Sequence, residues 1–118
     1  METSQTLLIL TSLPDDASAQ ALASTLVREG LAACVSILAP CRSTYRWQGT
    51  VEFAQEIPLL IKTATACYPA LESAIRAGHP YELPEIIAVP IAHGLPEYLD
   101  WVTAETLAQP PDGDHAKC

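Results

Sequence analysis

Hydrophobic positions in the first third of the chain change from the spacing of a strand to that of a helix. An apolar run from Thr6 to Ser12 predicts a buried strand, closed by a proline–aspartate turn. From Ala17 to Glu29, apolar residues recur three or four positions apart, which predicts an amphipathic helix. Asp15 or Asp16 is suited to cap its N-terminus, and Gly30 follows its last turn, where a left-handed residue is common.

The next segments predict a long β-hairpin. Strand-forming residues run from Leu31 to Trp47, with a break at Pro40, because proline has no N–H for a strand ladder. Gln48-Gly49 supplies the turn, and Val51 to Thr63 returns as a third strand. Pro58 within that strand favours a bulge or an edge position.

The remaining elements are a helix, a strand and a last helix. The second helix is expected to begin near Cys67 and to end at Gly78. Glu85 to Ala92 is a nearly continuous apolar run, so we expect a central or covered strand. The last helix starts at Pro96, whereas residues 108–118 have a composition that predicts a disordered tail.

The element order is therefore βαββαβ with a C-terminal helix, within one domain covering residues 1–107. With right-handed crossovers, this order predicts a ferredoxin-like α+β two-layer sandwich with an antiparallel sheet.

The predicted hairpin is too long for a compact chain of 118 residues. The second and third strands are too long for such a domain: about sixteen residues at about 3.3 Å each span roughly 50 Å, whereas a compact domain of this size has a diameter of only about 35 Å. We therefore expect the hairpin tip to overhang the sheet and to pair with another copy of the chain. Aromatic residues are enriched in interface cores, and the candidate contacts are Tyr45, Trp47, Phe53 and Trp101.

Composition and charge limit the function classes. Hydrophobic residues make up 49% of the chain, which is enough for a core, and the formal net charge is −8. This acidic balance argues against nucleic-acid binding. The chain shows no apolar run of transmembrane length and no basic segment before its first strand, so the expectation is a cytoplasmic protein without a membrane partner.

Four cysteines occur without a C-x-x-C pair, which gives no support to a zinc site or a redox motif. In a reducing compartment they are expected to be free thiols. They are Cys34, Cys41, Cys67 and Cys118.

Several short motifs together resemble the CutA divalent-cation-tolerance family. They are Leu31-Ala32-Ala33-Cys34-Val35, Tyr45-Arg46-Trp47-Gln48-Gly49, Leu60-Ile61-Lys62-Thr63, His79-Pro80-Tyr81-Glu82-Leu83-Pro84-Glu85 and Tyr98-Leu99-Asp100-Trp101. The resemblance covers roughly Leu7 to Leu107. It implies a homotrimer built like the PII signalling proteins, a role in tolerance of copper or other divalent cations, and no catalysed reaction.

The resemblance also implies a copper site, which can be checked by position. Copper-associated members use a cysteine near the end of the first strand and two adjacent histidines before Pro-Tyr. Here these positions hold Thr11, Gly78 and His79. His79 is thus the one metal candidate that remains, and one imidazole does not hold a transition metal tightly, because such sites need three or four donors.

Four further residues are candidates for a ligand cleft: Glu56, Lys62, Tyr81 and Glu85. Glu56 and Lys62 lie at even spacing on one predicted strand and so share a face. Lys62 forms either a structural ion pair with Glu56, Glu52 or Glu85, or part of a cleft between subunits in which it holds an anionic group. The loop from His79 to Glu85 is either a rigid structural turn or a functional loop.

Three function classes follow. The leading interpretation is a trimeric divalent-cation-tolerance protein that responds to metal ions. The alternatives are a PII-like trimer that binds a small molecule and a trimeric scaffold without a ligand. An enzyme is disfavoured, because no motif places a cysteine nucleophile next to a histidine base.

Overall fold

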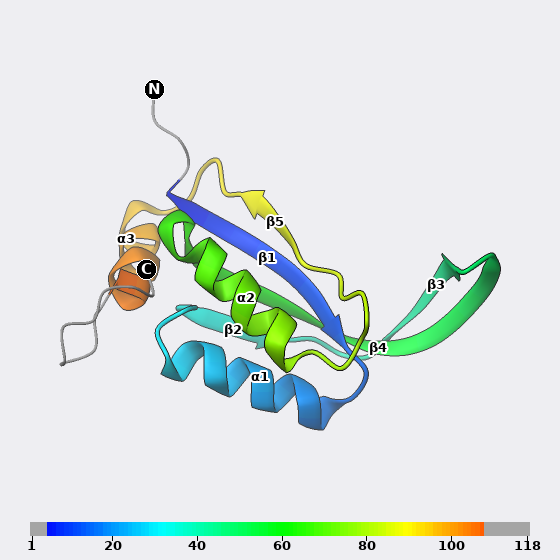
Figure 1. The fold of residues 1–118 in the computed structure, drawn as a ribbon. Coiled ribbons are helices and arrows are strands. Elements are labelled where there is room, and N and C mark those ends of the chain that lie inside the picture. Colours follow the sequence, from blue (N-terminus) through cyan, green and yellow to red (C-terminus); the bar gives the residue numbers. More distant parts are fainter. Residues whose placement is uncertain (1–4, 108–118) are drawn as a thin grey trace.

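Two helices cover one face of an antiparallel sheet in the computed structural model, which describes residues 5–107 (Figure 1). The elements in chain order are β1 (Thr6–Leu13), α1 (Asp16–Arg28), β2 (Cys34–Ile37), β3 (Cys41–Trp47), β4 (Thr50–Ala64), a 3-10 turn (Thr65–Cys67), α2 (Tyr68–Gly78), β5 (Ile87–Pro90) and α3 (Pro96–Leu107). The strand order is β2-β4-β1-β5, and β3 pairs with the first half of β4. The predicted ferredoxin-like α+β sandwich is confirmed.

The helix ends are formed as the sequence predicts. The Asp15 side chain caps α1 by accepting a hydrogen bond from the Ser18 N–H at 2.7 Å, and this bond holds the pKa of the Asp15 carboxyl below its usual value. Gly30 follows α1 with φ +74°, a conformation that glycine adopts without strain. In α2, a proline occupies the first turn, where its missing N–H costs nothing.

The core lies between the two helices and the sheet face that they cover. Alternate residues of β1 and β4 face the helices, as the period of a strand requires. The largest fully buried apolar side chains of this layer are Ile9, Leu13, Leu26, Leu59, Ile61, Leu71 and Ile75.

Two threonine hydroxyls are buried on this same face of the sheet, in different bonding states. Thr63 on β4 is 0% exposed and donates a hydrogen bond to the Leu31 carbonyl at 2.7 Å. Thr11 on β1 is 1% exposed, and its hydroxyl has no hydrogen-bond partner within residues 5–107. A buried hydroxyl without a partner reduces the stability of the fold.

The β3–β4 hairpin projects from one end of the molecule, opposite α3 (Figure 1). Its turn is formed by Gln48 and Gly49, both with positive φ (51° and 83°), which is the geometry that joins two twisted strands in two residues. The hairpin lengthens the molecule to 45 × 33 × 24 Å and raises the radius of gyration to 15.1 Å, against about 13 Å for a compact domain. The predicted overhang is confirmed.

Two strand expectations are wrong. Pro58 lies in the central strand β4, opposite Ser12 of β1, and not at an edge. Its backbone carbonyl accepts a hydrogen bond from the Leu38 N–H where the second predicted strand breaks into β2 and β3, so the missing N–H falls at an interruption of the ladder. The apolar strand β5 is an exposed edge, because nothing within the described residues covers it.

Cys34 and Cys41 are free thiols, as expected. The expectation is wrong for Cys67, which is disulfide-bonded and fully buried. Cys118 and the predicted tail at 108–118 lie outside the described residues. Within residues 5–107, no helix is both long and apolar enough to span a bilayer.

The two buried threonines give a matched pair of stability predictions. Thr11→Val removes an unpaired hydroxyl and is expected to raise the free energy of unfolding by about 1 kcal/mol. Thr63→Val leaves the Leu31 carbonyl without its donor and is expected to lower it by roughly 1–2 kcal/mol. Urea denaturation followed by circular dichroism measures both; equal destabilisation by the two variants would contradict the assignment.

Candidate ligand groove

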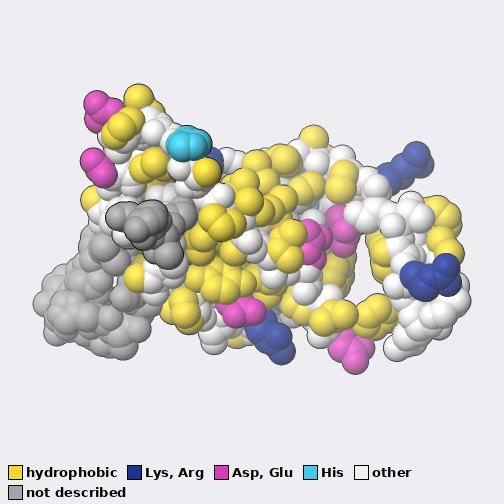
Figure 2. Space-filling view, turned by 90° about the horizontal axis from the view of Figure 1, so that it is seen from above, with side chains coloured by type: hydrophobic (Ala, Val, Ile, Leu, Met, Phe, Trp, Pro, Cys, Tyr) yellow, Lys and Arg dark blue, Asp and Glu magenta, His cyan; other side chains and the backbone are white. Residues whose placement is uncertain are grey.

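A groove of about 740 Å³ lies between the projecting hairpin and the loop that follows α2. Side chains from β1, β3, β4 and this loop form its walls, namely Ser12, Ser43, Thr44, Tyr45, Arg46, Trp47, Glu56, Pro80, Tyr81, Glu82, Leu83 and Glu85. We call it the Tyr81 groove. Figure 2 shows the molecule open between its body and the hairpin, with basic side chains on the hairpin itself.

Glu56 is held in place by two hydroxyl groups. Ser43 Oγ donates to Glu56 Oε1 at 2.7 Å, and the Tyr81 hydroxyl donates to Glu56 Oε2 at 3.1 Å. Both oxygens of the Glu56 carboxylate are thus hydrogen-bond acceptors. The carboxylate thereby joins β3, β4 and the loop at the base of the hairpin.

His79 links the same loop to β1 through hydrogen bonds of its ring. It is 9% exposed, and its Nδ1 accepts a hydrogen bond from the Tyr81 N–H at 3.1 Å. Since Nδ1 is an acceptor, the proton of the neutral ring is on Nε2, which donates to the Ser12 carbonyl at 2.7 Å. The His79 and Tyr81 rings also lie 4.9 Å apart between centroids. Both nitrogens of His79 are therefore used to hold Tyr81 against β1.

The surroundings of Tyr81 favour its neutral phenol. Burial contributes most, and the hydrogen bond and charge of Glu56 add to it; together they raise the pKa of Tyr81 to about 12. The phenol is thus a stable hydrogen-bond donor throughout the neutral range.

The structure brings together three of the four predicted cleft residues. Glu56, Tyr81 and Glu85 line the Tyr81 groove, whereas Lys62 does not. Lys62 lies six residues further along β4, roughly 20 Å away, and its Nζ is 6.0 Å from the centroid of the Tyr98 ring. Within residues 5–107, Lys62 forms no ion pair with any of the three carboxylates considered for it, Glu56, Glu52 and Glu85.

Sequence reasoning missed Ser43, Arg46 and Glu82 as groove residues. Ser43 is a partner of Glu56 only because β3 pairs with β4 in a particular register, with Cys41 opposite Glu56. The strand period alone does not provide that register. Glu82 lay within the loop already considered, and its charge was the available signal.

The copper donors that the resemblance implies do not fit this chain. Thr11 offers a hydroxyl, Gly78 has no side chain, and both ring nitrogens of His79 are engaged. Moreover, within residues 5–107 no three histidine, cysteine, aspartate or glutamate side chains converge as a metal site requires.

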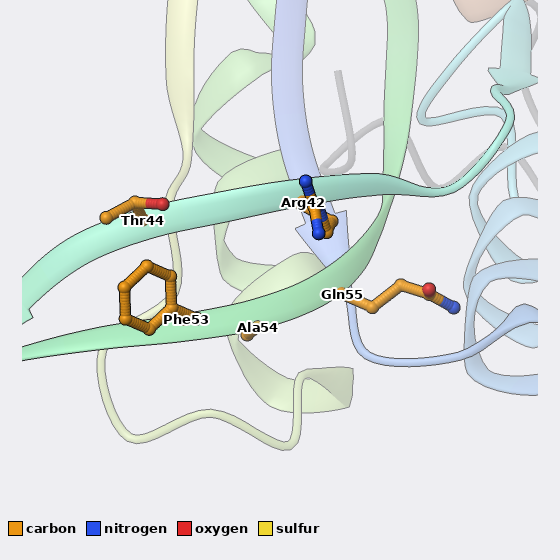
Figure 3. A pocket seen from close by; sticks show the side chains of 5 residues that line it. All are labelled: Arg42, Thr44, Phe53, Ala54 and Gln55. Carbon is orange, nitrogen blue, oxygen red and sulfur yellow. The ribbon is translucent and has the colours of Figure 1, made fainter.

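A second hollow, of about 470 Å³, lies on the hairpin alone, where Arg42 and Thr44 of β3 face Phe53, Ala54 and Gln55 of β4 (Figure 3). Thr44 is paired with Phe53, and Arg42 with Gln55. The Phe53 ring is 76% exposed. This apolar side chain therefore projects from the hairpin without cover from the described part of its own chain.

The fold defines a ferredoxin-like α+β protein with an overhanging hairpin. Residues 7–105 match the family of the CutA1 divalent ion tolerance protein, and the chain belongs to this family.

Relatives support this membership over nearly their full length. The divalent-cation tolerance protein CutA of Thermus thermophilus is 48% identical over 98 residues, which are 83% of this chain and 95% of the relative. The crystal structure of CutA from Xylella fastidiosa has a TM-score of 0.85 at 50% identity and covers 87% of this chain and 99% of its own. The CutA structure from Archaeoglobus fulgidus has a TM-score of 0.83 at 34% identity, over 86% of this chain and 98% of its own.

The Archaeoglobus relative overturns one expectation. It is described as a periplasmic divalent cation tolerance protein. The cytoplasmic location expected for this chain is therefore contradicted.

The raised pKa of Tyr81 has a measurable consequence. Because the folded value of about 12 lies above the ordinary value of 10, the stability that it contributes is complete below about pH 10 and is lost as the pH rises through 12. Phenolate absorbance of the wild type minus that of Tyr81→Phe is expected to have its midpoint near pH 12, and Glu56→Gln is expected to move the midpoint towards 10. A wild-type midpoint near 10 would contradict the bonding described for Tyr81.

Proposed function

We propose that this protein acts in the response to divalent metal ions as a homotrimer and not as an enzyme. The observation that carries the proposal is the overhanging hairpin in a chain of the CutA1 family. The relatives are named for divalent-cation tolerance and not for a reaction.

The hairpin supports assembly through its exposed side chains. Tyr45 is 44% exposed, Val51 is 51% exposed and Phe53 is 76% exposed. Apolar side chains gathered on an overhanging strand pair are costly in water, and a partner chain removes that cost.

The sheet face opposite α1 and α2 supports assembly as well. Ile87 and Val89 on the edge strand β5 are 50% and 45% exposed, and Trp101 on α3 is 43% exposed. A second copy seated here would cover the apolar strand that its own chain leaves open.

The absence of an enzymatic role is supported by what the thiols contact. Within residues 5–107, no cysteine is hydrogen-bonded to a histidine: the sulfur of Cys41 is 4.0 Å from Ser43 Oγ, and His79 bonds to Ser12 and Tyr81. Cys34 has no hydrogen-bond partner among the described side chains. A thiol nucleophile needs an adjacent base.

The assembly is tested at Phe53. Sedimentation equilibrium of the wild type is expected to give three times the mass of one chain. Phe53→Glu is expected to lower this mass towards that of a single chain, because a charge replaces the most exposed apolar contact. Val27→Glu, on the outer surface of α1 and 45% exposed, is the matched control and is expected to keep the wild-type mass. A monomeric wild type would contradict the proposal.

The metal response is tested separately. In a bacterial strain that lacks its own CutA, the wild type is expected to restore growth in copper, and Phe53→Glu is expected to restore it less.

In calorimetric titration with copper, His79→Asn is expected to bind copper as weakly as the wild type, since both nitrogens of His79 already have partners. Stoichiometric binding lost in His79→Asn would show direct coordination instead.

A further inference from the structure

A disulfide-bonded cysteine is buried where β4, α2 and α3 meet. Cys67 ends the 3-10 turn between β4 and α2, is disulfide-bonded and is 0% exposed. Its sulfur lies 3.4 Å from the carbonyl oxygen of Thr106, in the last turn of α3, and Thr106 is 1% exposed. Nothing in the proposed metal response requires this bond, so it needs an explanation of its own.

The partner of Cys67 follows from the state of the other thiols. The chain has four cysteines, and Cys34 and Cys41 are free. Cys118 is therefore the one cysteine of the same chain that remains as a partner. Because Cys118 lies outside the described residues, the assignment depends on the other three cysteines and on the length of the chain between the two sulfurs.

The course of the chain brings its end close to Cys67. Helix α3 ends at Leu107, one residue beyond the carbonyl that the Cys67 sulfur contacts. Eleven residues follow Leu107 up to Cys118, and such a stretch reaches at most about 36–40 Å, far more than the return to Cys67 requires. A short tether gives the two sulfurs an effective concentration in the millimolar range. A cysteine of a second copy has no such tether.

We propose that Cys67 and Cys118 form an intrachain disulfide, and that this bond is a redox-sensitive switch that joins the C-terminal end of the chain to the junction of β4 and α2. The closed loop contains α2, β5 and α3, which are the elements that follow β4. The proposal does not depend on the metal response or on the assembly, because it concerns a bond within one chain.

The switch exchanges electrons with a low-molecular-weight thiol–disulfide couple. On oxidation, the two cysteine thiols lose two protons and two electrons as their S–S bond forms, and a small disulfide is reduced to two thiols. On reduction, a small thiolate attacks the Cys118 sulfur, because Cys67 is buried, and Cys67 leaves as a thiolate that takes up a proton. A second small thiolate then releases Cys118 and forms the small disulfide.

The structure also accommodates the reduced form of Cys67. The S–H of the thiol is placed to donate to the Thr106 carbonyl 3.4 Å away, which is among the last carbonyls of α3 and so has no partner within that helix. A thiol is also well suited to an apolar interior. Reduction is therefore expected to open the covalent link while α3 keeps its packing, which makes the change reversible.

Peptide mapping of the full chain tests the bond. The protein is incubated with glutathione disulfide, its free thiols are alkylated, and it is cleaved after glutamate without reduction. The expected product links residues 57–72, which contain Cys67, to residues 106–118, with alkylation at Cys34 and Cys41 alone. A link from 57–72 to any other peptide, a covalent dimer in the intact mass, or alkylation of all four cysteines would overturn the proposal.

Thermal unfolding at one protein concentration tests the switch. Dithiothreitol is expected to lower the unfolding midpoint of the wild type by roughly 10 °C, because the open loop gives the unfolded chain more freedom. Cys118→Ser removes the proposed partner without changing Cys67, and is expected to unfold at the midpoint of the reduced wild type with or without dithiothreitol. Cys41→Ser changes an exposed free thiol and is expected to respond to dithiothreitol as the wild type does. A wild type that does not respond, or a Cys118→Ser variant that responds equally, overturns the proposal.

Discussion

The structure depends on strand β4, which belongs both to the central sheet and to the projecting hairpin. The second half of β4 pairs with β1 on one side and β2 on the other, inside the sheet that α1 and α2 cover. Its first half leaves that sheet and pairs with β3 alone. Because both halves belong to one continuous strand, the hairpin cannot fold back onto the core without breaking the pairing of β4 with β1 and β2. The overhang is therefore a consequence of how the core is built.

Glu56 stands where β4 passes from the hairpin to the core. Its hydrogen bonds to Ser43 and Tyr81 join the hairpin to the loop after α2, and His79 ties that loop to β1. The histidine that resembles a metal ligand in sequence is thus a structural support in this chain. The same contacts that orient the hairpin also shape the Tyr81 groove.

The sequence predicted the helices well, because caps and apolar spacing are local: Asp15 and Gly30 bound α1 where they were expected. It predicted the hairpin from Gln48-Gly49 and from the length of the strand that follows.

The sequence failed at β5, where an apolar run indicated burial, because the surface that would cover β5 does not belong to the described part of the chain. It also failed at Lys62. Even spacing identifies a shared face of a strand, but not a shared site when the residues are far apart along it. Ser43 required the register of β3 on β4, which only the folded sheet provides.

We propose that the two halves of β4 are stabilised by different partners, the core half by its own chain and the hairpin half by another copy. Amide hydrogen exchange along β4, followed over a range of protein concentrations, tests it most directly. The account predicts that protection from Leu59 to Thr63 does not change on dilution, whereas protection from Val51 to Gln55 falls as the assembly dissociates. Protection that is equal in both halves at every concentration would contradict it.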